Sequence, residues 1–188
     1  MVIGVVLSLA LLILRESSPN SAVLGRRPDG DEFADLVTHP DYAAIPGLVI
    51  YRFDGPLVFP TADRFAGEVR ALVRAGTPVA GTGAQASQHG TAAQEWVRGP
   101  REPVRAVVLD LEATADMDTT AADQLVDLVT ALRKAGIRIM LARLHAPVRD
   151  FMEKDGLVEL VGAAEIYPRV LDAVRSFEAS AVTAAGSA

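Results

Sequence analysis

The residues best suited to chemistry lie in one short stretch, VVLDLEATADMDTTAADQL, at residues 107–125. An apolar run there ends in four acidic residues: Asp110, Glu112, Asp116 and Asp118. The threonine pair Thr119 and Thr120 follows directly. Carboxylates at this density could bind a metal ion or take part in phosphoryl transfer. In the other interpretation, the threonine pair is the functional site and the acidic residues only form its surroundings.

One enzyme class can be compared with these residues directly. A phosphatase of the haloacid dehalogenase type requires D-x-D-x-T after an apolar strand, whereas residues 110–114 read D-x-E-x-T. The second acid of that motif is the general acid, and the longer Glu112 side chain would misplace it. The downstream lysine and the acidic metal-binding pair of that family are not evident at fitting positions. The phosphatase is therefore a minor alternative, and we expect no enzymatic activity.

The acidic residues also have a structural interpretation. Asp118 directly precedes an apolar helical period, and an aspartate at that position accepts hydrogen bonds from the free N–H groups of the first turn. Asp110, at the end of an apolar strand, and Asp116 are interpreted as loop or helix-cap acids. Thr119 and Thr120 then either cap the helix or stand at an N-terminus that could receive a phosphate or a partner.

Apolar patterns indicate which elements hold this stretch in place. Apolar runs predict strands at residues 48–53, 106–109 and 137–141, and a short edge strand at residues 22–26. Helical spacing predicts helices over residues 60–75 and 119–135, a third that opens at Pro147, and a last one around residues 170–177. Strands that alternate with helices imply an α/β domain with parallel pairing at the centre of its sheet.

Composition narrows the function classes. The chain has 188 residues, no cysteine and a formal net charge of −6. The length suits one domain with a real core, and the acidic balance argues against nucleic acid as a partner. The lack of cysteine excludes disulfides, thiolate metal sites and cysteine nucleophiles. His39, His89 and His145 fall in different segments, so neither a metal site nor a cofactor is expected.

The N-terminal residues resemble part of a membrane segment. Residues 1–14, MVIGVVLSLALLIL, carry no charge. As a helix they would reach about 21 Å, short of a hydrocarbon core about 30 Å thick. A signal peptide would need a basic start, which this sequence lacks. We therefore interpret residues 1–16 as the end of a membrane helix that begins before this chain.

Composition also sets the other boundaries. Residues 17–45 read as a linker with the first edge strand, and residues 20–178 are expected to fold alone as one domain. Residues 78–100 are expected to be a flexible intervening loop. Within it, Gly81-Thr82-Gly83 lacks the flanking strand and helix of a nucleotide-binding fingerprint. Residues 179–188 are expected to form a disordered tail.

The stretch from residue 105 to residue 160 resembles a STAS domain, the fold of anti-sigma-factor antagonists. That family shows a strand ending in D-L, a gap, and then D-S-S-G opening a helix. Asp110-Leu111 and Asp118-Thr119-Thr120-Ala121 stand at those places, with Thr for both Ser residues and Ala for Gly. The resemblance implies a mixed central β-sheet with about four to five α-helices packed against it. It also implies that Thr120 holds the position that a partner kinase phosphorylates.

Two further stretches, PNSAVLGR at residues 19–26 and PGLVIYRFDGPLVF at residues 46–59, resemble the C-terminal part of SulP anion transporters of the sulfate permease type. In those transporters the last membrane helix runs into this pattern. The positions that fit are Pro19, Ala22, Leu24, Gly25, Arg26, Pro46, Gly47, Leu48, Arg52, Phe53, Asp54, Pro56, Leu57 and Phe59. The resemblance implies a domain at the cytoplasmic face of the plasma membrane that acts in regulation, assembly or trafficking of the transporter.

The resemblance also implies partners. These are the membrane domain of the same transporter, a regulatory protein or a nucleotide at the surface of Asp118, Thr119 and Thr120, and a second copy in a homodimer formed through the transporter. The alternative is a free-standing, antagonist-like partner switch phosphorylated on Thr120. Recovery of the protein in the soluble fraction of the cell would favour that alternative.

Overall fold

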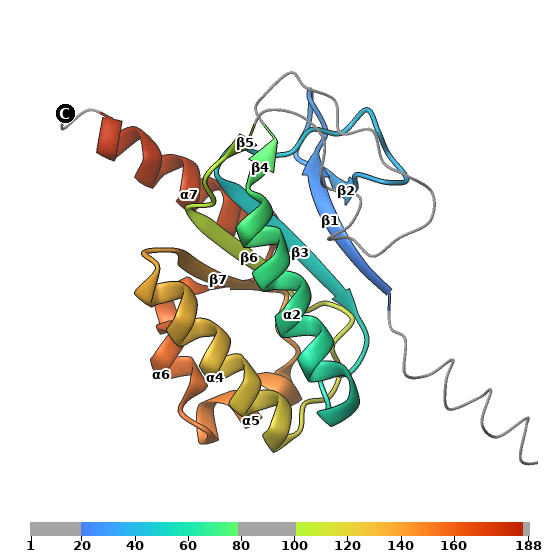
Figure 1. The fold of residues 1–188 in the computed structure, drawn as a ribbon, viewed down its shortest axis with the longest axis vertical. Helices are drawn as coiled ribbons and strands as arrows, with labels where there is room; N and C mark the ends of the chain where they lie inside the picture. Colours follow the sequence, from blue (N-terminus) through green and yellow to red (C-terminus); the bar gives the residue numbers. More distant parts are fainter. Residues whose placement is uncertain (1–19, 79–100, 186–188) are drawn as a thin grey trace, which may run out of the picture.

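The computed structural model describes residues 20–78 and 101–185 of the chain (Figure 1). The expected membrane-helix end at residues 1–16 and nearly all of the expected loop at residues 78–100 lie outside the described residues, so both remain predictions. Within the described ranges, no helix has the length and apolar character needed to cross a membrane.

A six-stranded mixed sheet forms the centre of the fold, in the order β2-β1-β3-β6-β7-β8. Its strands are β1 (Asn20–Arg26), β2 (Phe33–Asp35), β3 (Leu48–Asp54), β6 (Ala106–Asp110), β7 (Arg138–Ala142) and β8 (Ile166–Tyr167). Strands β3, β6, β7 and β8 run parallel, and β1 is antiparallel to both of its neighbours. Because helices cover both faces, the central strands are continuous apolar runs. We call the end at which the parallel strands finish the C-terminal end of the sheet.

Helices pack on both faces of this sheet (Figure 1). One face is covered by α2 (Phe59–Ala75), α4 (Thr119–Lys134), α5 (Ala146–Lys154) and α6 (Leu157–Val161). Among the described elements, α7 (Val170–Ala185) alone covers the other face, where Val174 and Phe177 join a core with Ile50, Val108 and Met140. The predicted mixed sheet with four to five helices is confirmed.

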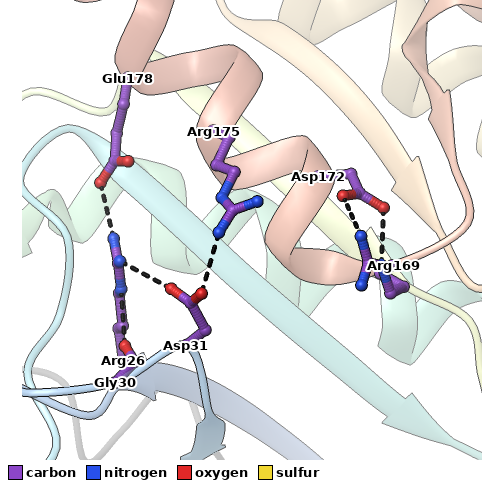
Figure 2. Close-up of polar contacts among 7 residues, drawn as sticks. All are labelled: Arg26, Gly30, Asp31, Arg169, Asp172, Arg175 and Glu178. Atoms are coloured by element: carbon purple, nitrogen blue, oxygen red, sulfur yellow. Dashed lines mark hydrogen bonds and ion pairs between the residues drawn. The ribbon is translucent and has the colours of Figure 1, made fainter.

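Ion pairs hold α7 against the β1–β2 hairpin (Figure 2). Arg26, the last residue of β1, contacts Glu178 at 3.1 Å and Asp31 at 3.0 Å. Asp31 also accepts a bond from Arg175 at 2.9 Å. These side chains are partly exposed, so each pair contributes little by itself, and the apolar face of α7 supplies most of the attachment.

On the face of the sheet away from α7, the buried carboxylate of Glu68 connects α2 to the strands. Glu68 accepts hydrogen bonds from the Tyr51 hydroxyl at 2.7 Å, from Arg64 Nε at 2.8 Å and from the Ser21 hydroxyl. Burial, assisted by the Glu68 charge, raises the pKa of Tyr51 above its usual value. The Tyr51 hydroxyl therefore stays protonated and donates to Glu68, which joins β3 to α2. The Ser21 bond joins β1 to the same carboxylate.

Three sequence-based expectations need correction. The strand at residues 22–26 is not at the edge, because β2 pairs with residues 24–26 outside it. The sequence pattern does not predict β2 or β8, since two or three residues show no readable period. Helix α7 continues to Ala185, although a disordered tail was expected from residue 179. Alanine, which has the highest helix propensity, fills much of this stretch and extends the helix.

The described residues on either side of residues 79–100 pair as a short antiparallel ribbon. Strand β4 (Thr77–Pro78) pairs with β5 (Arg101–Glu102), with Thr77 opposite Glu102. Thr77 is fully buried, and its hydroxyl accepts a hydrogen bond from the Gly47 N–H at 2.7 Å. The ribbon brings the two ends of the segment together, so a short link could join them.

We expect a short Gly-Ser link in place of residues 79–100 to change the melting temperature by less than about 3 °C, or roughly 1 kcal/mol at this size. The physical reason is that Gly, Ala, Thr and Gln dominate this segment and offer little apolar surface to offset the entropy of ordering it. Thermal unfolding of the two chains measures the difference. A drop of more than about 8 °C, or roughly 2 kcal/mol, would show that the segment packs on the core.

Candidate functional site

The N-termini of α2 and α4 meet at the C-terminal end of the sheet (Figure 1). Backbone hydrogen bonds join the segments that precede them. The Leu57 N–H donates to the Asp116 carbonyl at 3.0 Å, and the Asp118 N–H donates to the Leu57 carbonyl at 3.1 Å. The buried Thr114 hydroxyl donates to the Gly55 carbonyl at 3.1 Å. The β3–α2 and β6–α4 connections therefore form one structural unit.

Asp118 caps both helices with one carboxylate. Its Oδ1 accepts a hydrogen bond from the Ala121 N–H, in the first turn of α4, at 2.8 Å. Its Oδ2 accepts a hydrogen bond from the N–H of Phe59, the first residue of α2, also at 2.8 Å. The positive ends of the two helix dipoles stabilise this negative charge. The predicted N-cap is confirmed, and the bond to α2 is an addition.

The threonine pair is exposed beside this cap. Thr119 and Thr120 are the first two residues of α4. In the part of the chain that the structure describes, neither hydroxyl makes a hydrogen bond, so Asp118 and not the threonines caps the helix. The neighbouring Phe59 side chain is 68% exposed. We call Phe59, Asp118, Thr119 and Thr120 the two-helix surface.

Asp110 has a different role from the one expected. It does not cap a helix: its side chain is fully buried and pairs with Arg143, the residue that follows β7. Arg143 Nε donates to Asp110 Oδ1 at 2.8 Å, and Nη2 contacts Oδ2. The same guanidinium contacts the exposed Glu112 through Nη1. Sequence analysis did not single out Arg143, although parallel pairing of two successive strands places their C-terminal ends side by side.

Arg143 is held in an unusual backbone conformation. Its φ of 59° lies in the left-handed region, where a glycine is ordinarily favoured. Burial alone would lower the pKa of Arg143, but the hydrogen bonds and charges of Asp110 and Glu112 raise it above its usual value. The guanidinium is therefore a permanent cation at the end of the sheet, and its ion pair offsets the backbone strain.

Asp116 does not cap a helix either. Among the described residues, its carboxylate accepts a hydrogen bond only from the neighbouring Met117 N–H at 2.9 Å, and its side chain is exposed. The residue acts through its backbone carbonyl, which receives the Leu57 N–H. Of the three aspartates that were candidates for capping, Asp118 alone has that role.

The geometry does not suit the phosphatase alternative. The nucleophile of that mechanism would be Asp110, but this carboxylate is fully buried and occupied by Arg143. The position of the general acid is Glu112, which the same guanidinium contacts. Among the described residues, no group of three or more potential ligands is placed to hold a metal ion. His39 and His145 lie in separate loops, and His89 falls outside the described residues.

Comparison with known proteins agrees with this arrangement. A model of the STAS domain family matches residues 39–173. A probable sulfate transporter of Mycobacterium tuberculosis H37Rv is 30% identical over 174 residues, which cover 93% of this chain and 27% of the relative. Sulfate transporter 1.1 of Arabidopsis thaliana is 28% identical over 182 residues, 93% of this chain and 24% of the relative. The chain thus spans about a quarter of the length of these relatives.

Solved structures share the fold. The murine solute carrier 26 family member A9 anion transporter, in its inward-facing state, superimposes with a TM-score of 0.70 at 22% identity, over 95% of this chain and 25% of that chain. The STAS domain of a SulP transporter from Vibrio cholerae gives a TM-score of 0.52 at 20% identity, over 78% of this chain and 92% of that chain.

The family model covers most of the chain and includes both strand–helix connections that build the two-helix surface. The fold is shared with the solved STAS domain of the Vibrio cholerae transporter. The resemblance stated from Asp110-Leu111 and the D-T-T sequence is confirmed, and this chain belongs to the STAS domain family.

Proposed function

We propose that this chain is the regulatory STAS domain of a SulP-type anion transporter, acting at the cytoplasmic face of the plasma membrane. The main support for the proposal is the length of the match to a sulfate transporter, which covers 93% of the chain. The family model begins only at residue 39, so the match to the transporter must include residues before it. The similarity thus extends beyond the stretch that the family model matches, toward the apolar N-terminal segment.

The two-helix surface is the part of the domain best suited to a regulatory contact. Thr120 is exposed in the first turn of α4, and its hydroxyl is not used by the fold. A phosphate there would add about −1.5 to −2 charges. The N-terminus of α4 would stabilise that charge, while Asp116, Asp118 and Asp123 would oppose it. The fold therefore tolerates the modification, and the surface that a regulatory protein meets becomes more negative.

We expect Thr120→Glu in the full-length protein to change sulfate uptake by about fivefold or more, the range of ordinary allosteric coupling. Its unfolding free energy should stay within about 1 kcal/mol of the parent, because helix N-termini accept acidic residues. Thr120→Val should cost less than about 0.5 kcal/mol, since the hydroxyl has no partner among the described residues. Uptake assays and thermal unfolding of both variants supply the two measurements.

Thr130→Glu is the matched control. Thr130 is also exposed on α4 but lies far from its N-terminus, so the same change of charge should leave uptake unaltered. If Thr120→Glu and Thr120→Val both transport at the parental rate, Thr120 is not a regulatory position.

The exposed hydroxyl of Thr120 also fits a second candidate, a free-standing partner switch phosphorylated on that residue. The two candidates differ in where the native protein resides. A transporter domain stays in the membrane fraction through an alkaline wash, whereas a free-standing switch is recovered in the supernatant.

A further inference from the structure

The start of β1 and the two-helix surface lie at the same end of the sheet. Asn20 pairs with Asp54, the last residue of β3, and α2 begins five positions after Asp54. The first described residue is therefore at the C-terminal end of the sheet, the end at which α2 also begins. Residues 15–19 separate it from the apolar segment at residues 1–14, and five residues span at most about 17 Å. If that segment lies in the membrane, this end of the domain is the end nearest to it.

An exposed aromatic side chain occupies this end. Phe59 and Val182 are the two large hydrophobic side chains that are strongly exposed in the described residues, at 68% and 74%. The bond from the Phe59 N–H to Asp118 fixes its backbone, and the exposed Pro56 and Pro60 lie close to it in the sequence. An exposed aromatic ring on a fixed backbone, with apolar neighbours, is a typical anchor of a protein–protein contact.

The charged residues of α2 and α4 are polarised along the domain. Near the two-helix surface the exposed charged residues on these helices and the preceding loop are Asp63, Asp116 and Asp123, and the half-buried Arg64 is paired with Glu68. At the opposite end the same helices finish in Arg74 and in Arg133 and Lys134. The end nearest the N-terminal segment therefore presents negative charge around Phe59.

This charge selects one kind of partner. The cytoplasmic leaflet of a membrane is negative and attracts basic segments, so it would repel the acidic end of the domain. Cytoplasmic loops between membrane helices are enriched in Lys and Arg. Such loops complement the acids, and an apolar position among them could accept the Phe59 ring.

We infer that the two-helix surface docks on the Lys/Arg-bearing cytoplasmic loops of the membrane-embedded part of the same protein, with Phe59 as the anchor. The inference rests on the proposed function, because it needs residues 1–14 to continue a membrane helix. It assigns the end of the domain at which α2 and α4 begin to the membrane domain and leaves the end at which they finish facing the cytoplasm. A charge placed on Thr120 would then act directly at this contact.

Single cysteines test the inference, because this chain contains none of its own. Thr119→Cys and Thr130→Cys are made in the full-length protein after cysteines outside this chain have been removed, so the Phe59 ring stays in place. The rate of labelling by a bulky, membrane-impermeant maleimide is measured in inside-out vesicles and divided by the rate in SDS. The two sites are matched, because both are exposed threonines of α4 and Thr119 alone belongs to the two-helix surface. We expect labelling at residue 119 to be about tenfold slower than at residue 130, because an interface excludes water and reagent.

A benzophenone maleimide on Thr119→Cys identifies what covers the two-helix surface. Cross-links to a Lys/Arg-bearing loop of the membrane domain support the inference. Cross-links to lipid alone, or equal labelling of residues 119 and 130, overturn it. A membrane-bound protein with equal labelling contradicts the docking only, whereas a protein absent from the vesicles contradicts the proposed function itself. The two failures are therefore distinguishable.

Discussion

Arg143→Met is expected to lower the free energy of unfolding by about 3 kcal/mol, which corresponds to a fall in melting temperature of about 6–12 °C at this size. Asp110 is fully buried, and Arg143 is its cationic partner. Removing the guanidinium leaves a charge away from water that only the Glu112 N–H still contacts, at 3.4 Å. Urea unfolding of the variant and the parent measures the loss.

Two control variants separate the buried pair from the exposed one. Glu112 contacts the same guanidinium, but its side chain is 56% exposed, so Glu112→Gln should cost less than about 1 kcal/mol. The double variant Asp110→Asn with Arg143→Met removes both charges of the buried pair. We expect it to recover about half or more of the stability lost in Arg143→Met. Equal losses for Glu112→Gln and Arg143→Met would contradict the assignment of Asp110 as the residue that needs this cation.

The pair of Asp110 and Arg143 shows what local patterns miss. The two residues are 33 positions apart, and no spacing rule within one element connects them. Strand order could have connected them, because Asp110 ends β6 and Arg143 directly follows β7, its parallel neighbour. The left-handed conformation of Arg143 has no signal in the sequence, since residues other than glycine seldom adopt it. Asp110 was therefore interpreted as a cap or loop acid from its immediate neighbours alone.

Elements with a long apolar period were predictable. Strands β3, β6 and β7 are buried on both faces and read as continuous apolar runs. Helices α2 and α4 have wide apolar stripes, and their predicted limits differ by one residue from those observed. Strands β2 and β8 were not predicted, because their existence depends on a neighbouring strand and not on their own two or three residues.

The candidate site was predictable where it is local. Asp118 lies three residues before the N–H that it caps, so its role in α4 follows from the sequence. Its bond to Phe59 joins residues 59 positions apart in the sequence. That bond could be predicted only from a fold in which the N-termini of the two helices lie together. The sequence therefore located the α4 part of the two-helix surface, but it did not place Phe59 there or show that one carboxylate joins the two helices.

Asp118→Ala is expected to lower the free energy of unfolding by about 2–3 kcal/mol, more than the roughly 1 kcal/mol of an ordinary N-cap. The reason is that the variant leaves two backbone N–H groups without their acceptor, those of Ala121 and Phe59. It also removes a negative charge from the positive ends of two helix dipoles. Chemical unfolding of the variant and the parent under the same conditions gives the value.

A graded series distinguishes a double cap from a single one. Asp118→Asn keeps one acceptor oxygen, so it can cap one helix but presents an amide N–H₂ to the other, and its cost should be about half that of Asp118→Ala. Asp116→Ala is the control, since that carboxylate contacts only the adjacent Met117 N–H, and its cost should stay below about 0.5 kcal/mol. If Asp118→Asn costs almost nothing while Asp118→Ala costs about 1 kcal/mol, only one of the two bonds contributes to stability. A confirmed double cap would mean that Asp118 fixes Phe59 and Thr120 relative to each other, so a change at one residue alters the surface that both present to a partner.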